Sequence, residues 1–384
     1  MKYSLTFFLS ISIFLIFSCG ETASESASEP KNNPYSISGQ VENPVDSGIV
    51  TLSLFDPVTQ KKTELSTNMM DTSGHYQLSF DFTEPDLFRL DFPNRQSVML
   101  VIGEGQKDIK VNVEGKRNGN VEIIGSEDSE KLLGYDIFRN DSNKRLIKPA
   151  YDAMRAATDK GDTQGEVEAV QAYGKASYEH RKELIDYSMD NIGNSIALYG
   201  TMLRWTGDDE VEKLEKLVKD FEKAHPNLTM TSVMVDKVAR YKKVAIGAIA
   251  PDFTLADTSG NNLNLNDLKG KYTLLDFWAS WCSPCLLQVP DLKEAYGMYH
   301  EKGFEIVGVS VDSKGDRWKK AINKYEMNWP HVSDLKGWGS EIAADYNVTF
   351  IPFNMLIDSE GKIIAKNLHS KELQGKLAEL FSEG

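Results

Sequence analysis

The chain has 384 residues and a formal net charge of −14 at pH 7, with 41% hydrophobic and 10% aromatic residues. This length allows two or three domains, each with an apolar core of its own. Proteins that bind nucleic acid or anionic membrane surfaces usually carry basic patches, so the acidic balance excludes nucleic acid as an expected partner.

Residues 1–18 have the form of a secretory signal peptide. Lys2 is followed by an almost unbroken apolar run from Leu5 to Phe17, which is too short to span a bilayer comfortably. The run ends in the letters LIFSCG at 15–20, which resemble a bacterial lipobox. In lipoproteins with this signal the cysteine is diacylated and becomes the mature N-terminus, so the resemblance implies a lipid anchor at Cys19. The alternative is an ordinary signal peptide or membrane anchor that contains a cysteine by chance.

Residues 19–34 predict a disordered tether. After Cys19 the sequence is small, polar and acidic, and no side chain up to Pro30 is large enough and apolar enough to anchor a core. Such a tether would let a folded body stand off the membrane, on the periplasmic side or at the cell surface, while it remains attached.

Residues 35–126 carry the signals of a β domain. Apolar and polar residues alternate in several short runs, and turn-forming residues separate these runs. The runs with this alternation are 35–41, 49–55, 76–82 and 111–113. We expect an antiparallel β-sandwich. The glycine pattern, with DTSGHY at 71–76 and VEIIGS at 121–126, resembles an uncharacterised β domain that precedes thioredoxin-like domains in bacterial lipoproteins.

Residues 127–243 change to helical periodicity, with many Lys, Glu, Ala and Asp residues, as in EVEKLEKLV at 210–218. His180, His225 and Asp186 are isolated in the sequence and form no recognisable chemical motif. The segment is interpreted as a helical spacer or a docking surface.

Residues 244–384 alternate strand and helix patterns, and Pro251 marks the junction with the preceding segment. Expected strands are 272–278, 304–311, 354–357 and 362–365, and expected helices are 285–300, 316–325 and a terminal one from Ser370. The order indicates an α/β domain that follows the β and helical parts in a multidomain chain.

The chemistry is expected where the first of these strands ends, in the letters LLDFWASWCSPC at 274–285. A cysteine just before a helix, with its partner three residues later, places both sulfurs on one side of the first turn, close enough for a disulfide to form and break. The free N–H groups and the positive end of the helix dipole stabilise a thiolate at Cys282. Cys282 is therefore the predicted nucleophile, and Cys285, which should be the more buried, resolves the mixed disulfide.

The motif and the order of elements around it resemble the thioredoxin superfamily. The PDF sequence at 251–253 and the DTSG turn at 257–260 are more similar to the membrane-tethered thiol-disulfide reductases of the ResA and TlpA type. The resemblance implies a thioredoxin-like fold over the last 140 or so residues, a redox disulfide between Cys282 and Cys285, a disulfide-containing client protein, a membrane-bound electron donor and no cofactor. Pro284 matches reducing thioredoxins, which favours reduction over oxidation or isomerisation.

The resemblance assigns Asp276 the place of the buried acid of thioredoxins. In that role the carboxylate would take the proton from Cys285 through water. The lysine that thioredoxins set near this acid falls at Gly308, and the glutamate that several tethered reductases carry after the second cysteine falls at Gln288. Asp276 is therefore expected to act alone. The alternative is an exposed carboxylate at the strand end.

The same resemblance places a cis-proline at Pro352, opposite the cysteine pair, where Ile351 would offer backbone hydrogen bonds to an extended substrate. Trp278 and Trp281 can each be a core aromatic or part of a substrate platform, and Trp281, next to Cys282, is favoured as the substrate contact.

Other uses of the cysteines fit less well. A structural zinc site needs four ligands and this pair supplies two, so no metal is expected. Covalent haem attachment needs a histidine where Leu286 stands. Peroxiredoxins carry proline and threonine where Leu275 and Ala279 stand, which disfavours peroxidase activity. The non-enzymatic alternative is a cell-envelope binding protein that uses the fold as a scaffold.

Overall fold

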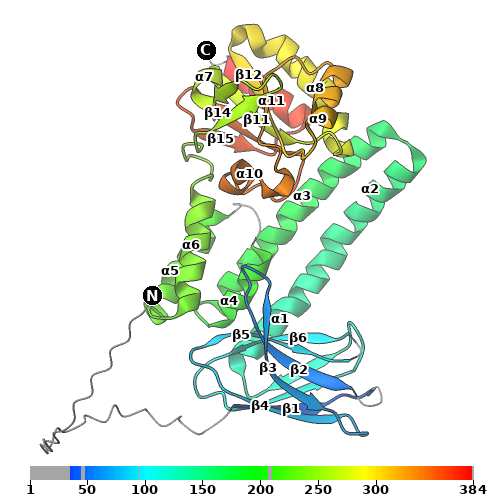
Figure 1. The fold of residues 1–384 in the computed structure, drawn as a ribbon, viewed down its shortest axis with the longest axis vertical. Helices are drawn as coiled ribbons and strands as arrows, with labels where there is room; N and C mark the ends of the chain where they lie inside the picture. Colours follow the sequence, from blue (N-terminus) through cyan, green and yellow to red (C-terminus); the bar gives the residue numbers. More distant parts are fainter. Residues whose placement is uncertain (1–34, 45–47, 94, 206–209, 383–384) are drawn as a thin grey trace, which may run out of the picture. The chain divides into compact units, whose positions relative to one another are not determined.

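The computed structural model describes residues 35–382, except 45–47, 94 and 206–209. The predicted signal peptide, the tether and Cys19 lie outside the described residues. Within the described part of the chain, no helix is both long enough and apolar enough to cross a bilayer. The predicted multidomain class is confirmed, with β sheets first, helices in the middle and an α/β domain at the end (Figure 1). The boundaries after residues 126 and 243 stay predictions.

The β domain consists of two four-stranded sheets, ordered β4-β1-β7-β8 and β3-β2-β5-β6. Their strands are β1 Tyr35–Gln40, β2 Ile49–Phe55, β3 Lys62–Met69, β4 His75–Phe80, β5 Asp86–Asp91, β6 Ser97–Ile102, β7 Asp108–Val113 and β8 Val121–Ile124. Ile37 and Val111 of one sheet share an apolar core with Leu52 and Leu100 of the other, as expected for a sandwich. The pairing departs from the expected antiparallel arrangement at β1 and β7, which run parallel.

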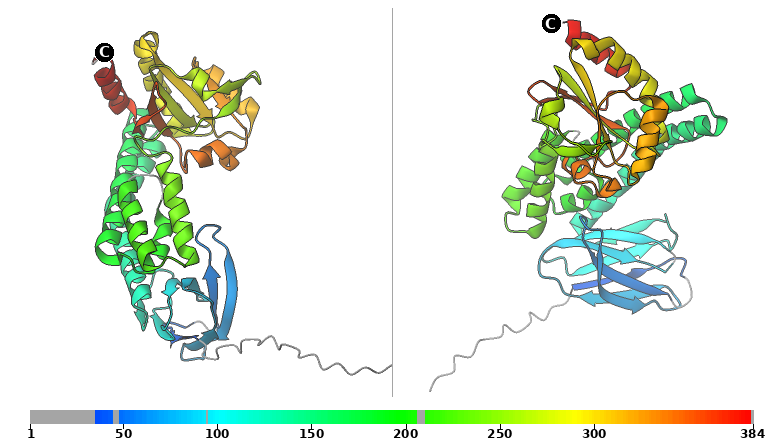
Figure 2. Two further views of the ribbon diagram at one scale, coloured as in Figure 1. Left: turned by 90° about the vertical axis from the view of Figure 1, so that its left-hand side faces the viewer. Right: turned by 45° about the horizontal axis from the view of Figure 1, so that its top comes forward.

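The helical part follows directly. Its α-helices are α1 Glu127–Ser142, α2 Lys148–Lys160, α3 Thr163–Tyr187, α4 Ala197–Thr201, α5 Val211–Ala224 and α6 Thr229–Lys242, with π-helical turns at Asn143–Ile147 and Ser188–Ile192 and a 3-10 turn at Met202–Arg204. Helices α2 and α3 lie side by side in both views of Figure 2. In α5 the buried residues Leu214, Leu217, Val218 and Phe221 recur at helical spacing, so one face packs inward and the charged face meets solvent.

The C-terminal domain is built on a seven-stranded sheet with the order β10-β9-β13-β12-β11-β14-β15. The strands are β9 Thr254–Asp257, β10 Asn262–Asn264, β11 Tyr272–Trp278, β12 Phe304–Ser310, β13 His331–Ser333, β14 Phe353–Asp358 and β15 Ile363–Lys366. The helices are α7 Leu265–Leu268, α8 Ser283–Tyr299, α9 Gly315–Tyr325, α10 Glu341–Asp345 and α11 Ser370–Ser382, with 3-10 turns at His300–Lys302 and Gly337–Gly339.

Strand β11 occupies the middle of this sheet, parallel to β12 and antiparallel to β14. Every residue from Thr273 to Trp278 is buried, because helices cover both faces of a central strand in such a sheet. Burial on both faces explains why the sequence of this strand is a continuous apolar run. The strand ends at Trp278, four residues before Cys282, so the sheet delivers the cysteine pair to its carboxyl edge.

Candidate active site

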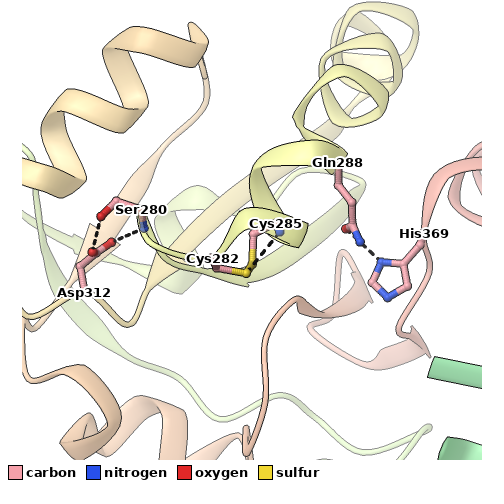
Figure 3. Close-up of a disulfide and its surroundings, with 6 residues drawn as sticks. All are labelled: Ser280, Cys282, Cys285, Gln288, Asp312 and His369. Atoms are coloured by element: carbon pink, nitrogen blue, oxygen red, sulfur yellow. Dashed lines mark hydrogen bonds between the residues drawn. A yellow bond between two sulfur atoms is a disulfide. The ribbon is translucent and has the colours of Figure 1, made fainter. Parts of the chain in front are cut away.

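Cys282 and Cys285 form a disulfide at the N-terminus of α8 (Figure 3). Cys282 is the N-cap residue, and its Sγ accepts a hydrogen bond of 3.2 Å from the backbone N–H of Cys285. Both residues are 5% exposed, so the expectation that Cys285 would be the more buried of the two is wrong for this oxidised state. The cap geometry requires extended backbone at Cys282, which leaves its sulfur in front of the free N–H groups of the first turn.

The N-terminus of α8 favours a negatively charged sulfur at Cys282. The Cys285 N–H already points at Sγ, and the aligned peptide dipoles of a 17-residue helix place partial positive charge there. Pro284 in the first turn has no N–H and so leaves no donor unsatisfied. In the reduced protein these donors would lower the pKa of the Cys282 thiol.

A buried carboxylate holds the loop between β11 and α8. Asp312 accepts hydrogen bonds from the backbone N–H of Ser280 at 2.8 Å and from its hydroxyl at 2.6 Å (Figure 3). The hydroxyl of Ser310 donates to the same carboxylate at 2.9 Å. Asp312 is 1% exposed, so these three bonds replace water around its charge. Local sequence patterns did not reveal the role of Asp312, because it lies 32 positions from Ser280.

Asp276 lies inside the sheet, on β11, with 7% of its surface exposed. Burial raises the pKa of its carboxyl to about 7. The expected buried acid is therefore present, and the exposed alternative does not hold. At neutral pH a group with this pKa exists in both protonation states, which suits it to accept and return a proton. Its neighbours in register are Gly308 on β12 and Asn354 on β14.

The imidazole of His331 fills the space beside Gly308. A Cβ at position 308 would lie 2.3 Å from Nδ1 of His331 and 3.0 Å from Nε1 of Trp278. His331 pairs with Gly308 across β12 and β13, and its ring meets the Trp278 ring edge-on at 5.4 Å between centroids. Burial lowers the pKa of His331 to about 4, and the Met327 backbone opposes this shift only in part. A neutral ring therefore lies beside Gly308, the position at which thioredoxins carry a lysine.

Gln288, one turn after Cys285, contacts a histidine that the sequence did not single out. Its Oε1 lies 3.1 Å from Nδ1 of His369, which precedes α11 (Figure 3). Gln288 is 6% exposed, and burial lowers the pKa of His369 to about 4. Both side chains are therefore uncharged at neutral pH. The 81 positions between them explain why local sequence patterns did not reveal the contact.

The Ile351–Pro352 peptide bond is cis, as expected, and directly precedes β14. Pro352 is buried and Ile351 is partly exposed. Trp281 is 52% exposed, whereas Trp278 is 2% exposed, so only the former is available to a substrate. The Trp281 ring lies 6.4 Å from that of Trp338, which is also 52% exposed and was not anticipated.

No group of three or more His, Cys, Asp or Glu side chains suited to a metal ion occurs among the residues that the structure describes. Near the disulfide, Asp312 bonds to Ser280, the Cys285 N–H bonds to Cys282 Sγ, and His369 bonds to Gln288. The arrangement has the parts needed for thiol-disulfide exchange: a sulfur at a helix N-terminus, a second sulfur behind it and a buried acid with a near-neutral pKa.

Comparison with known proteins assigns this domain. Residues 246–366 match the AhpC/TSA family. The chain is 34% identical over 142 residues to the thiol-disulfide oxidoreductase ResA of Bacillus cereus, a match that covers 36% of this chain and 80% of that protein. ResA of Bacillus subtilis is 34% identical over 123 residues, with 32% and 67% covered. Among solved structures, the thioredoxin domain of a thiol-disulfide oxidoreductase from Bacteroides vulgatus is 39% identical, covers 35% of this chain and 97% of its own, and has a TM-score of 0.34.

Proposed function

Because this chain belongs to the ResA-like family of thiol-disulfide oxidoreductases, we propose that it reduces protein disulfides in the cell envelope while tethered to a membrane through Cys19. The observation that carries the proposal is the Cys282–Cys285 disulfide at the N-terminus of α8, with a backbone N–H directed at the Cys282 sulfur. A helix terminus that stabilises a thiolate there makes Cys282 the attacking group.

In the first step the Cys282 thiolate attacks one sulfur of a client disulfide. A bond forms between Cys282 Sγ and that sulfur, the client disulfide breaks, and the other client sulfur leaves with the electron pair and takes up a proton. An extended client segment would hydrogen-bond to the backbone of Ile351, next to Pro352, and its side chains would contact Trp281.

In the second step Cys285 resolves the mixed disulfide. Its thiol loses a proton, which Asp276 accepts, and the thiolate attacks Cys282 Sγ. The Cys282–Cys285 disulfide forms and the remaining client sulfur leaves as a thiolate, so the client gains two electrons and the protein loses two. A membrane-bound donor must then return two electrons to the pair before the next cycle.

The direction of electron flow is the part of the proposal that depends most on one residue, Pro284, which matches reducing relatives. Equilibration of the full-length protein with glutathione buffers tests it. A reduction potential near that of thioredoxin, about −270 mV, supports reduction, whereas a value near −120 mV, as in strong oxidants, would make the protein an oxidase.

Activity and clients can be tested together. The wild-type protein should accelerate the reduction of insulin by dithiothreitol, and Cys282→Ser should abolish this acceleration. Cys285→Ser should trap mixed disulfides that name the clients. Equal insulin reduction by wild type and Cys282→Ser would favour a binding protein. A fatty-acid probe tests the anchor, since wild type should be labelled and Cys19→Ala should not.

A further inference from the structure

Three polar side chains behind Cys285, two of them buried and one partly buried, have no part in the proposed reaction as described so far. Gln288 on α8 contacts His369 (Figure 3), and Asn354 on β14 bonds to the backbone of Leu368, the residue before His369. None of these three residues carries a charge at neutral pH, because burial keeps the His369 ring neutral. Because they are uncharged, these side chains can act by holding neighbouring segments in place.

Asn354 anchors one end. Its Nδ2 donates to the Leu368 carbonyl at 2.8 Å, and its Oδ1 accepts from the Leu368 N–H at 2.9 Å. Its own carbonyl accepts from the N–H of Asn367 at 2.9 Å. Asn354 is 1% exposed, so the three bonds are shielded from water. The segment that carries His369 is therefore fixed to the strand next to β11.

Helix α8 holds this segment from the other side. His369 meets Gln288 at 3.1 Å, and the next residue, Ser370, donates its hydroxyl to Asp291 on the same helix. With the amide oriented as in the structure, Nδ1 of His369 carries the proton and donates to Gln288 Oε1. Positions 285 and 288 lie on one face of the helix, since residues three apart are neighbours there.

These polar contacts connect three parts of the exchange site. Asn354 stands beside Asp276 in the sheet register and two residues after Pro352, while Gln288 stands one turn after Cys285. To resolve the mixed disulfide, the Cys285 sulfur must stay close to Cys282 and to its proton acceptor Asp276 after the Cys282–Cys285 disulfide has opened. The first turn of α8 must therefore keep its position on the sheet in the mixed disulfide.

We propose that Gln288 and His369 form a positioning pair that holds Cys285 in place for the resolving step. The inference rests on the proposed exchange at Cys282 and Cys285. The pair acts mainly on the second step, because the Asp312–Ser280 bonds hold the loop before Cys282 independently of Gln288 and His369. An uncharged pair also puts no negative charge near the Cys285 thiolate, which a glutamate at 288 would do.

Reaction of the fully reduced, full-length protein with 5,5′-dithiobis(2-nitrobenzoate) separates the two steps. Attack by Cys282 releases one nitrothiobenzoate anion and forms a mixed disulfide; attack by Cys285 then releases a second anion and closes the protein disulfide. His369→Leu and Gln288→Leu should slow the second release by roughly fivefold to tenfold, because each removes the hydrogen bond that joins α8 to the segment before α11. The first release should stay within about twofold of wild type.

His369→Gln is the conservative variant, since its amide can still donate to Gln288, and it should restore most of the resolving rate. Thr273→Val is the matched control: it removes a 2.9 Å hydrogen bond from the Gly270 N–H at the opposite end of β11 and should change neither release. Three outcomes would overturn the positioning role of Gln288 and His369. They are equal slowing of both releases, unchanged kinetics in the leucine variants, and a His369→Gln variant as slow as His369→Leu. Normal two-step kinetics with no insulin reduction would instead defeat only the proposed reductase function.

Discussion

The cores before and after residue 245 differ in what they bury. Among the described residues, buried polar side chains in the β and helical parts are Ser, Thr and Gln, whereas the C-terminal domain also buries Asp276, Asp312 and His331. A carboxylate or a charged imidazole removed from water costs free energy, so a core that only has to fold avoids Asp and His. All three groups lie around the strand and loop that lead to the cysteine pair. Buried Asp and His side chains therefore distinguish the chemical part of this molecule from its structural part.

The largest effect should come from a change that displaces a member of this buried set. Gly308→Val places a side chain in the space of the His331 ring, where a Cβ alone would lie 2.3 Å from Nδ1. We expect a loss of about 3 kcal/mol in the free energy of unfolding, measured by urea titration. Gly375→Ala is the control, since no atom lies within 4 Å of its added Cβ. An unchanged unfolding midpoint for Gly308→Val would mean that the ring is not fixed there.

Asp276→Asn tests the cost of a buried acid. Burial raises its folded pKa to about 7 from 3.8, so the folded protein keeps a proton that the unfolded chain has already released between about pH 4 and 7. The group's contribution to stability therefore falls as pH rises through this window and is lost above it. Between pH 5 and pH 8 wild type should lose about 2 kcal/mol relative to Asp276→Asn in urea unfolding. Parallel pH curves would contradict the raised pKa.

Asp276→Asn should also slow disulfide exchange at neutral pH, because the amide cannot take the proton from Cys285. The two readouts are independent, since one measures the equilibrium of folding and the other the rate of thiol release. An unchanged rate would leave the residue a buried acid without a catalytic role.

Ser129→Ala tests the β and helical parts, whose role in the comparison is structural. Its hydroxyl donates to the Val101 carbonyl at 2.9 Å and accepts from the Val101 N–H at 3.0 Å, which joins α1 to β6. The substitution should cost about 1.5 kcal/mol of unfolding free energy and leave insulin reduction by the folded protein unchanged. A lower rate at full folding would show that the β and helical parts influence the cysteine pair.

The smallest effect is expected at the exposed rim of the site. Trp338→Ala removes one of two indole rings that are each 52% exposed; the other, Trp281, precedes Cys282. We expect the KM for insulin to rise about threefold, or somewhat under 1 kcal/mol, with no change in the reaction with 5,5′-dithiobis(2-nitrobenzoate). Met298→Ala, which removes an equally exposed apolar side chain from α8, should change neither value. A KM that does not move would exclude Trp338 from client binding.

The sequence predicted what depends on neighbouring residues. The apolar run of β11, the cysteine spacing at the start of α8 and the proline before β14 are local signals, and each marks its element in the structure. Strand β3 was missed because most of its residues are exposed and no apolar alternation marks it, and β13 because it has only three residues. The contacts of Asp312, His331 and His369 join distant segments, which no window along the chain can reveal.

The cap of α8 has a consequence for observing the protein at work. The N–H of Cys285 donates to the sulfur whose bonding changes at every step of the cycle. As that sulfur passes from disulfide to thiolate to mixed disulfide, its strength as a hydrogen-bond acceptor changes, and a charged acceptor binds the N–H most strongly. The Cys285 amide resonance in an ¹⁵N-labelled sample would therefore act as a built-in reporter of redox state, readable without any dye or client.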